Sequence, residues 1–439
     1  MNKKDKIRAK IAKLISEYYS AEKEPFIPGK SLVRYAGSVY GSKEINAVID
    51  SYLSGWLGLG KQGELFQSEF AKYVGTKYSV LTNSGSSANL LALTALTSWK
   101  FPNRLQEGDE VIVAASGFPS TINPIVQNRL VPVFLDVDEQ TYNLRAADLG
   151  KAMSKKTKLI VICHNLGNPN EMDEIMNFAK RNNLMVFEDN CDALGSTYDG
   201  KKTGSFGIMA SESFYPAHHM TTGGEGGAVI INDDFRLYRI VQSFRDWGRA
   251  CWCGASGGPQ NGVCGFRFRF KVDGFPYDHK YIFEHIGYNL KPTEAQAAMG
   301  RVQLRRVPRF IEKRKKNFRI YNNFFKQYEK FFILPKALPK SDPSWFSYLL
   351  TIRDNAPFDR LAITSFLEES NIQTRPSFSG NILRQPAYKQ GQVKYRVVGS
   401  LKNSDRIFER TFFIGIYPAL TKKHLDYVMS AFKKFLSKY

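Results

Sequence analysis

Short apolar runs rich in β-branched residues alternate along this chain with segments of helical length. The runs are YSVLT, DEVIVAA, VPVFLDV, KLIVICH, LMVFED, SESFYP and GAVIIN, and they fall between residues 78 and 232. Runs that are apolar throughout indicate strands buried on both faces. Helices between successive strands indicate parallel pairing, because a parallel connection needs a crossover of about a dozen residues or more. The sequence therefore predicts an α/β fold with a mostly parallel sheet covered on both faces.

The 439 residues exceed the length of one minimal domain. We expect three parts: an N-terminal helix and arm (1–60), a large domain (61–291) with a cysteine-rich loop (248–265), and a small C-terminal domain (292–439). The spacing of Ile7, Ile11 and Leu14 predicts an amphipathic N-terminal helix. A single long, charged helix is expected to begin near Pro292.

The net charge of +21 is spread along the whole chain and forms no dense run. It is compatible with a generally basic surface, with attraction of anionic substrates, or with an acidic protein partner. No helix-turn-helix appendage is visible, so we expect no nucleic-acid partner. No apolar stretch approaches the roughly 18 residues of a membrane span, and the N-terminus lacks the apolar segment of a signal peptide. We therefore expect a cytoplasmic protein without a membrane partner.

Two strand ends carry polar side chains, and ligands of open α/β sheets bind at the carboxyl ends of strands. After YSVLT, residues 83–88 (NSGSSA) form a turn into a helix. Its backbone amides could hold a phosphate, or the turn could simply cap the helix. After LMVFE comes Asp189, whose carboxylate is costly to bury without a cation. A protonated pyridine nitrogen would satisfy it, and so would a structural ion pair.

The cysteines are unevenly distributed. Cys251, Cys253 and Cys264 lie in a glycine-rich loop, and Cys191 follows a strand end. If the fold brings Cys191 to this loop, four thiolates could bind zinc or an iron–sulfur cluster. The spacing matches neither the usual zinc pairs nor the common ferredoxin runs, so scattered core cysteines remain an alternative. Cys163 is interpreted as a small buried hydrophobe.

The segment that follows SESFY resembles an active-site turn. Residues 213–227 (SFYPAHHMTTGGEGG) are similar to the Ser-Phe-His-x-x-Lys and Thr-Gly-Glu-Gly-Gly pattern of the DegT/DnrJ/EryC1/StrS sugar aminotransferase family. Further similar segments are 84–87 (SGSS), 117–119 (GFP), 188–189 (ED), 287–290 (GYNL) and 294–298 (EAQAA). The resemblance implies the fold-type I architecture of pyridoxal-phosphate-dependent transferases, with a large, mostly parallel sheet domain and a smaller C-terminal α+β domain. The turn has one glycine more than the family pattern at 223–224.

His218 is the most informative departure, because the family carries at this position the lysine that binds pyridoxal phosphate covalently. No lysine occurs between Lys202 and Lys271. Without an amine in reach the protein cannot tether the cofactor, whereas an imidazole can still move protons near neutral pH. We therefore expect freely bound pyridoxamine phosphate (or pyridoxal phosphate), with His218 as the catalytic acid–base group. A core or capping histidine in an inactive protein is the alternative.

The resemblance also implies cofactor contacts at Gly85, Ser86, Phe118, Asp189, Asp192, Ser213 and Asn289. The resemblance implies that Phe118 lies on the face of the cofactor ring and that Asp189 keeps the pyridine nitrogen protonated. Asn289 reaches the phosphate from the neighbouring subunit, so we expect a homodimer. Asp192 stands where much of the family has glutamine. Arg375 and Arg384 resemble the region that binds the sugar nucleotide.

One branch of the family, the CDP-4-keto-6-deoxyglucose 3-dehydratase type, combines this histidine with a [2Fe–2S] cluster. The strings SFYPAHH, EDNCDALG and DWGRACWC are most similar to it. The branch implies cluster ligation by Cys191, Cys251, Cys253 and Cys264. It implies that the substrate is a nucleotide-linked 4-keto-6-deoxyhexose, with CDP favoured over dTDP or GDP. His218 would remove a proton from the cofactor's C4′ carbon, and the sugar would lose its C3 hydroxyl group. The product would serve 3,6-dideoxysugar and O-antigen synthesis.

Electrons for this reaction would come from a separate NAD(P)H-dependent flavin or iron–sulfur reductase, since no dinucleotide-binding fingerprint, in which G-x-G-x-x-G directly follows a strand, is visible in the chain. Three other functions remain open. The first is a cluster-free 3-dehydratase that regenerates its amine from glutamate, and the second is a sugar aminotransferase. The third, from a different class, is a non-catalytic basic binding or regulatory protein.

Overall fold

The computed structural model describes residues 2–21, 24–251 and 264–439. Its centre is an eight-stranded sheet with the order β1-β9-β8-β5-β4-β2-β3-β16. In that order the strands are Tyr78–Thr82, Gly227–Ile231, Met209–Ser213, Met185–Asp189, Thr157–Cys163, Glu110–Ala114, Val131–Leu135 and Arg396–Val397. Neighbouring strands are parallel, except that β9 runs antiparallel to β1 and β8. The predicted mostly parallel sheet is confirmed.

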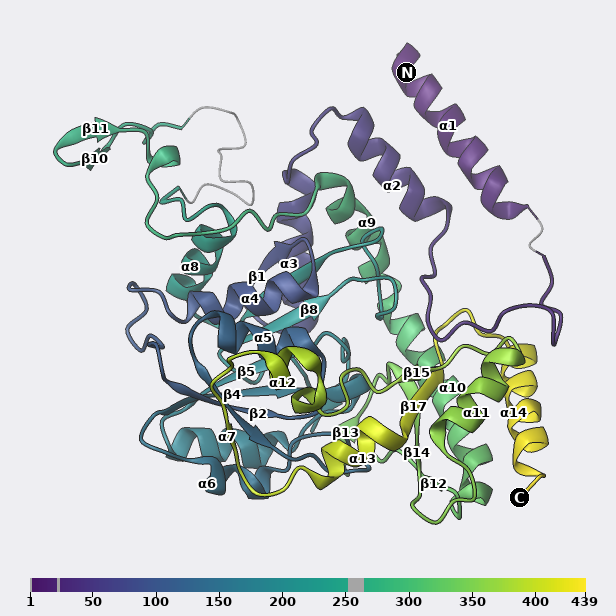
Figure 1. Ribbon diagram of the computed structural model, residues 1–439. Helices are drawn as coiled ribbons and strands as arrows, with labels where there is room; N and C mark the ends of the chain where they lie inside the picture. The colour runs from purple at the N-terminus through teal and green to yellow at the C-terminus, as the bar shows by residue number, and fades with distance from the viewer. Residues whose placement is uncertain (1, 22–23, 252–263) are drawn as a thin grey trace.

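Both faces of the large sheet are covered by helices. Along β2, Val111 and Val113 join one hydrophobic cluster while Ile112 and Ala114 join another, as the two-residue period of a strand requires. The first cluster includes residues of α4 (Gly85–Ala95), α5 (Pro119–Gln127) and α8 (Phe235–Arg245), and the second includes residues of α6 (Leu149–Ala152) and α7 (Met172–Arg181). Figure 1 shows α4 and α5 on one side of the sheet and α6 and α7 on the other.

Local sequence signals set the helix starts near the sheet edge. Pro119 opens α5, where its missing N–H costs nothing. Asp234 caps α8 by accepting a hydrogen bond from the amide of Leu237. Thr293 and Gln296 form a capping box on α9 (Glu294–Leu304). These residues fix the positions at which α5, α8 and α9 begin.

A second, antiparallel sheet lies in the C-terminal part, with the order β12-β14-β17-β15. Its strands are Phe332–Ile333, Ser347–Ile352, Thr411–Gly415 and Arg375–Pro376. A separate hydrophobic cluster joins it to α10 (Val307–Phe325), α11 (Arg360–Glu369) and α14 (Lys422–Leu436). This mixture of an antiparallel sheet and helices agrees with the α+β character expected for the C-terminal part.

The prediction of a single long helix after Pro292 is wrong, because the structure has two helices there. α9 ends at Leu304 and α10 begins at Val307, with Pro308 in the first turn of α10. Proline lacks an amide hydrogen and clashes with the preceding turn, so it favours a helix start at this position over a continuous helix. α9 packs on α2 (Ser42–Leu53) and α3 (Lys61–Val74), and β16 joins the large sheet. The segment after residue 291 therefore contributes to both sheets.

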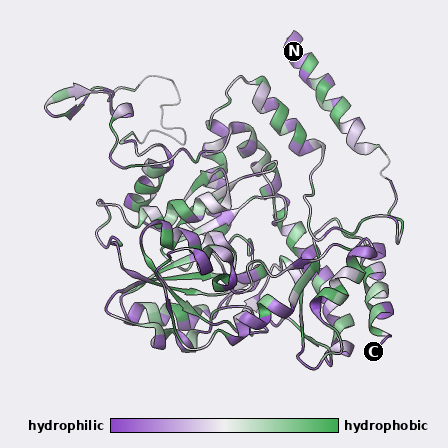
Figure 2. Ribbon diagram, in the orientation of Figure 1, coloured by the Kyte–Doolittle hydropathy of each residue, from purple (hydrophilic) through white to green (hydrophobic). Residues whose placement is uncertain are grey.

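The predicted N-terminal helix is present as α1 (Lys3–Ser20), and none of its residues is buried. Figure 2 shows hydrophobic and hydrophilic residues alternating along it, and Figure 1 shows it beside α2 at the edge of the molecule. Arg8 and Asp50 form an ion pair between the two helices at 3.8 Å. In the parts of the chain that the structure describes, no helix combines the length and apolar character needed to cross a bilayer.

The remaining elements are short. β10 (Phe270–Val272) and β11 (Phe275–Tyr277) form a hairpin that projects from the body (Figure 1). A small sheet has the order β13 (Ser341–Asp342), β6 (Thr197–Tyr198), β7 (Lys201–Lys202). The short helices are α12 (Pro386–Gln390), α13 (Lys402–Arg410) and the 3-10 turns Ala146–Asp148, Asn165–Gly167, His279–Tyr281, Lys326–Tyr328 and Ile382–Arg384.

Candidate active site

A cavity of about 480 Å³ opens between the large and the small sheet. Asp189 at the end of β5 and Ser213 at the end of β8 line it from the large sheet. Phe413 of β17 lines it from the small sheet. The carboxyl ends of parallel strands meet at one edge, so residues far apart in the sequence converge there.

The turn after β1 approaches this cavity with its backbone. Ser84 caps α4 by accepting a hydrogen bond from the amide of Ser87 at 3.0 Å. Gly85 and Ser86 line the cavity, and as the first residues of α4 their N–H groups have no acceptor within the helix. A Cβ added at Gly85 would lie 2.5 Å from the Cβ of Ser213, so only glycine fits. The turn therefore caps the helix and also presents donors that could hold a phosphate.

Asp189 is a buried carboxylate, with 3% of its surface exposed. Its Oδ2 accepts hydrogen bonds from Thr121 Oγ1 at 2.5 Å and Asn89 Nδ2 at 2.9 Å, and its Oδ1 accepts one from Ser211 Oγ at 3.3 Å. These donors are neutral, and among the described residues no lysine or arginine forms an ion pair with Asp189. A buried carboxylate without a cation is costly, so the site fits a protonated pyridine nitrogen.

His218 lines the same cavity, and 16% of its side chain is exposed. Its Nδ1 lies 3.4 Å from Oδ1 of Asp192, within ion-pair distance. Asp192 is fixed in turn by the amide of Leu166, which donates to Oδ2 at 3.3 Å. No lysine belongs to the described lining of the cavity. The described residues thus offer an imidazole and a carboxylate here, and no amine that could bind an aldehyde cofactor covalently.

Arg314 of α10 anchors the turn that carries His218. It is 1% exposed, and it donates from Nη2 to the carbonyl of His218 at 2.9 Å and from Nη1 to the carbonyl of Phe346 at 2.8 Å. Burial lowers the pKa of Arg314 to about 9, although the nearby Asp192 carboxylate acts in the opposite direction. These bonds join the turn that carries His218 to the residues just before β14, so α10 and the small sheet position the imidazole.

The sequence pattern of the DegT/DnrJ/EryC1/StrS aminotransferase family matches residues 39–433. The chain belongs to this family. The lipopolysaccharide biosynthesis protein RfbH of Salmonella typhimurium is 47% identical over 434 residues, which are 98% of each chain. The dTDP-4-dehydro-2,6-dideoxy-D-glucose 3-dehydratase of Saccharopolyspora spinosa is 45% identical, with 99% of this chain and 92% of that protein aligned.

Solved structures of the family have the same fold. The E. coli GDP-4-keto-6-deoxy-D-mannose-3-dehydratase with bound hydrated PLP superimposes with a TM-score of 0.82 at 29% identity, covering 91% of this chain and 98% of that one. The fold-type I architecture implied by the sequence resemblance is therefore confirmed, as is membership of the family.

The other residues that the family resemblance indicated divide into two groups. Phe118 and Arg375 line the cavity, Phe118 with 49% of its surface exposed and Arg375 with its guanidinium 4.4 Å from the ring centre of Tyr35. Asn289 and Arg384 do not belong to the lining. Asn289 forms a backbone bridge with Asp246, and the carbonyl of the next residue, Leu290, accepts a hydrogen bond from the amide of Asn83 at 2.8 Å. Arg384 is held outward by an ion pair with Asp405 at 2.7 Å.

Three of the four predicted cluster ligands lie within the described residues. Cys191 lines the cavity, whereas Cys264 lies before the β10–β11 hairpin with its Sγ 3.3 Å from Nε2 of His279. Cys251 is buried, and Cys253 lies outside the described residues. In residues 2–21, 24–251 and 264–439 no group of three or more histidine, cysteine or carboxylate side chains is arranged to hold a metal ion.

Cys163, which lines the cavity, was misinterpreted in the sequence, and the buried Glu212, next to the cavity residue Ser213, was missed. Cys163 lines the cavity and is more than a small core residue; burial raises the pKa of its thiol well above the usual range, and the Asp189 and Asp192 carboxylates add to this. Glu212 is fully buried on β8, and burial raises the pKa of its carboxyl well above the usual range. It accepts a hydrogen bond from Asn190 Nδ2 at 2.8 Å. The signal in the sequence that could have identified Glu212 was a glutamate inside an otherwise uncharged strand.

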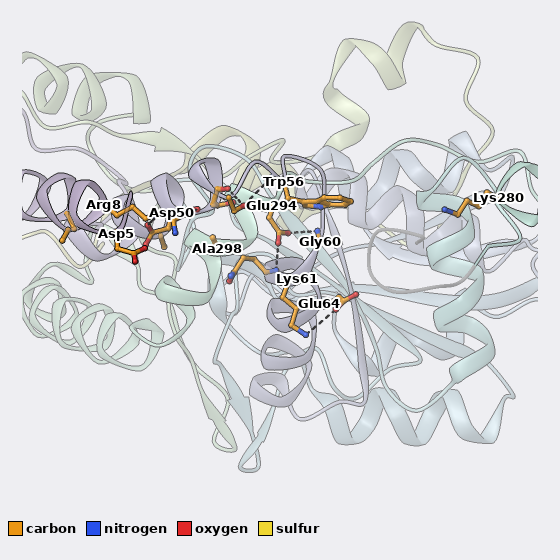
Figure 3. A pocket seen from close by; sticks show the side chains of 16 residues that line it. Asp5, Arg8, Asp50, Trp56, Gly60, Lys61, Glu64, Lys280, Glu294 and Ala298 are labelled. Carbon is orange, nitrogen blue, oxygen red and sulfur yellow. Dashed lines mark hydrogen bonds and ion pairs between the residues drawn. The ribbon is translucent and has the colours of Figure 1, made fainter. Parts of the chain in front are cut away.

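A larger hollow of about 1280 Å³ lies between α1, α2 and the start of α3 (Figure 3). Its described lining includes none of the predicted site residues. There the buried Glu294 accepts hydrogen bonds from the amides of Gly60 and Gln62, both at 2.6 Å, and so caps α3. The family-like segment 294–298 thus serves helix packing at this place, and the strand-end cavity is the candidate active site.

Proposed function

We propose that this protein removes the C3 hydroxyl group of a nucleotide-linked 4-keto-6-deoxyhexose with the help of pyridoxamine phosphate. The observation that carries the proposal is the position of His218. It replaces the tethering lysine of the family and points into the cavity beside Asp192, with no lysine in the described lining. Without that lysine a transaminase loses its anchor, whereas acid–base chemistry on a freely bound cofactor remains available.

The residues present fit pyridoxamine phosphate or pyridoxal phosphate. Gly85 and Ser86 offer amide donors for the phosphate, and the space at Gly85 would be filled by any Cβ. Ser213 adds a hydroxyl, Asp189 offers a buried carboxylate that lacks a cation among the described residues, and Phe118 offers a ring at the cavity edge. When bound, the cofactor supplies an amine that condenses with a ketone and a ring that withdraws electrons.

The chain's own residues would then position and move protons. His218 would take up and return a proton at its imidazole, whose Nδ1 lies 3.4 Å from Oδ1 of Asp192. Asp192 also stabilises the positively charged imidazolium that forms when His218 takes up a proton. Arg314 holds the backbone of this turn through the carbonyl of His218. Water exclusion comes from Phe346 and Phe413, which close the cavity on the side of the small sheet.

For the substrate we propose a nucleotide sugar, and CDP remains the favoured nucleotide because of the local strings around Cys191 and His218. Relatives bear the names of dTDP- and GDP-linked sugar 3-dehydratases, which supports the reaction type. Arg375 lies at the cavity and is the favoured contact for the diphosphate. Arg384 could contribute after release from Asp405. The product would enter deoxysugar synthesis for lipopolysaccharide, as the name of the RfbH relative suggests.

We also propose a [2Fe–2S] cluster on Cys191, Cys251, Cys253 and Cys264, with electrons supplied by an NAD(P)H-dependent reductase. Support comes from the cysteine pattern and its similarity to one branch of the family. Because the described cysteines are not grouped, no step is derived through the cluster. The cluster-free 3-dehydratase is the second candidate, because a solved structure of a GDP-4-keto-6-deoxymannose-3-dehydratase holds a trapped PLP-glutamate geminal diamine. A homodimer in which Asn289 reaches the partner's cofactor is proposed because the family resemblance implies it and Asn289 does not line the cavity of its own chain.

The test is anaerobic incubation of the purified protein, loaded with pyridoxamine phosphate, with CDP-, dTDP- and GDP-linked 4-keto-6-deoxyhexoses. A reductase and NADH are added in one arm and glutamate in the other. Loss of one oxygen from the sugar in the reductase arm alone supports the cluster-dependent reaction, and loss in the glutamate arm alone supports the cluster-free one. Transfer of an amino group to the sugar would instead identify an aminotransferase.

A further inference from the structure

Three phenylalanine rings form a continuous apolar wall on one side of the active-site cavity. The ring centres of Phe346, Phe378 and Phe413 lie 5.9 to 6.2 Å apart in all three pairs. All three residues line the cavity. Phe346 precedes β14, Phe378 follows β15 and Phe413 belongs to β17, so the whole wall comes from the small sheet. The polar lining at the Gly85 turn, Asp189 and Ser213 comes from the large sheet.

The wall lies next to the reacting groups. The ring centre of Phe346 is 5.3 Å from that of His218, and Phe378 is 5.6 Å from Phe118 in an edge-to-face contact. Phe413 lies 6.0 Å from Tyr35, whose ring is covered by the guanidinium of Arg375. The wall thus extends from the acid–base group to the cationic end of the cavity, which is the path that a bound sugar would follow.

Phe378 is held in an unfavourable backbone conformation. Its φ is +49°, a left-handed value that bulky residues rarely adopt. Such strain is concentrated at ligand-binding sites, where the surrounding structure enforces it. Phe346 and Phe413 are 4% and 2% exposed and belong to the packed core, whereas Phe378 is only partly buried and still lines the cavity. The strained turn therefore aims an aromatic ring at a ligand position.

We propose that Phe346, Phe378 and Phe413 bind the C6 methyl group of the sugar and so select 6-deoxy sugars over sugars with a C6 hydroxyl group. The inference rests on the proposed function, because it assumes that the cavity holds a nucleotide sugar. In such a substrate C1 carries the diphosphate, C2 and C3 carry hydroxyl groups, C4 is the ketone, and C5 carries the C6 methyl. The C6 methyl is its apolar substituent, and the wall is the apolar surface beside the cofactor position.

The expected selectivity follows from the chemistry of the wall. Phenylalanine rings offer no conventional hydrogen-bond donor or acceptor, so a C6 hydroxyl would lose its water without gaining a partner. An added hydroxyl group lowers the affinity of a ligand for an apolar pocket by about 10- to 100-fold. The loss is not larger, because the pocket has no buried polar group that the wrong ligand leaves unpaired. We expect a binding ratio in that range.

The experiment measures dissociation constants by calorimetry on the full-length protein loaded with pyridoxamine phosphate. The probes are CDP-6-deoxyglucose and CDP-glucose, together with the corresponding dTDP pair, which differ only at C6 and carry no ketone to react. The wild type is expected to bind the 6-deoxy member about 10- to 100-fold more tightly. Equal binding of the two members would overturn the inference and leave the proposed function standing. Binding of neither pair would overturn both.

Variants at position 378 make the test specific. Asparagine tolerates left-handed backbone, so Phe378→Asn keeps the turn and adds a hydrogen-bonding group to the wall. We expect it to reduce the ratio to about threefold or less, while Phe378→Leu keeps most of it. The matched control is Phe275→Asn on the β10–β11 hairpin, where the side chain is 74% exposed. An unchanged ratio in Phe378→Asn, or the same loss in Phe275→Asn, would contradict the proposal.

Discussion

The imidazole Nδ1 of His218 lies 3.4 Å from the carboxylate of Asp192, in a cavity whose described lining contains no lysine. This pair replaces the usual amine of the family with an acid–base couple. The backbone of His218 is held by Arg314, and the carboxylate of Asp192 is held by the amide of Leu166. The chain thus keeps the family's fold while an imidazole and a carboxylate stand where the family pattern has a lysine.

The first prediction restores the family's amine. His218→Lys should bind pyridoxal phosphate covalently, because an ε-amine would then reach the cofactor from the turn held by Arg314. After borohydride treatment, mass spectrometry should find the cofactor on the residue-218 peptide of the variant. The wild type should carry none. A reducible bond to any lysine of the wild type would contradict the proposed role of His218.

The second prediction concerns Asp192. Asp192→Asn removes the charge that stabilises the protonated imidazole of His218, so kcat for C3 dehydration should fall at least about tenfold. KM should stay within about threefold, since Asp192 acts on the acid–base step and not on substrate affinity. Steady-state kinetics measure both values. Asp273→Asn, on the exposed hairpin, makes the same chemical change and should leave both unchanged. A rise in KM with constant kcat would indicate a binding role instead.

The third prediction uses the close approach at Gly85. In Gly85→Ala the new methyl group would meet the Cβ of Ser213 at 2.5 Å, so the turn must move and the phosphate donors with it. The dissociation constant for pyridoxamine phosphate should rise at least about tenfold, which corresponds to about 1.4 kcal/mol. Gly150→Ala on α6 is the control, because nothing lies within 4 Å of its added Cβ. Fluorescence titration of the cofactor distinguishes the two.

The fourth prediction concerns pH and Glu212. Burial, with a smaller contribution from Asp189 and Asp192, raises the pKa of this carboxyl well above its ordinary value of 4.5. The folded protein therefore holds the proton more tightly than the unfolded chain. The contribution of this bound proton to the free energy of unfolding is complete below pH 4.5. As pH rises toward and through the folded-state pKa, the free energy of unfolding falls by about 1.4 kcal/mol per pH unit.

Glu212→Gln removes this titration and keeps an oxygen acceptor for Asn190. The unfolding temperature of this variant, relative to that of the wild type, should increase as pH rises from 5 to 9. Calorimetry measures both temperatures. Glu107→Gln is the control, because Glu107 is 70% exposed in its ion pair with Arg129. A difference between Glu212→Gln and wild type that does not change with pH would contradict the buried, protonated state.

The fifth prediction tests the cluster. Protein purified without oxygen should contain about two irons per chain, as a [2Fe–2S] cluster requires. Cys264→Ser should lose most of this iron. Cys163→Ser should keep it, because Cys163 lies at the end of β4 and belongs to no predicted ligand set. Iron analysis and the absorption spectrum give the result. Iron-free wild-type protein that still dehydrates the sugar with glutamate would favour the cluster-free enzyme.

Much of the site could be predicted because its residues follow strand ends. The hydrophobic runs located β1, β5 and β8, and the edge that they share brings Ser86, Asp189 and Ser213 to one cavity. His218 was found because it breaks a local pattern, which needs no tertiary information. The break between α9 and α10 was missed although Pro308 marks it, since the periodic charge pattern continues through the proline.

The sequence by itself determined the order of strands and helices, the family and the missing lysine, because these depend on residue types and spacings along the chain. The tertiary structure decided which side chains meet. Three features depend on contacts between segments that are 26 to 96 residues apart in the sequence. They are the distance from His218 to Asp192, the hydrogen bond from Arg314 to the carbonyl of His218, and the cluster of Phe346, Phe378 and Phe413. Such contacts follow from the packing of two sheets against each other, which local periodicity does not encode.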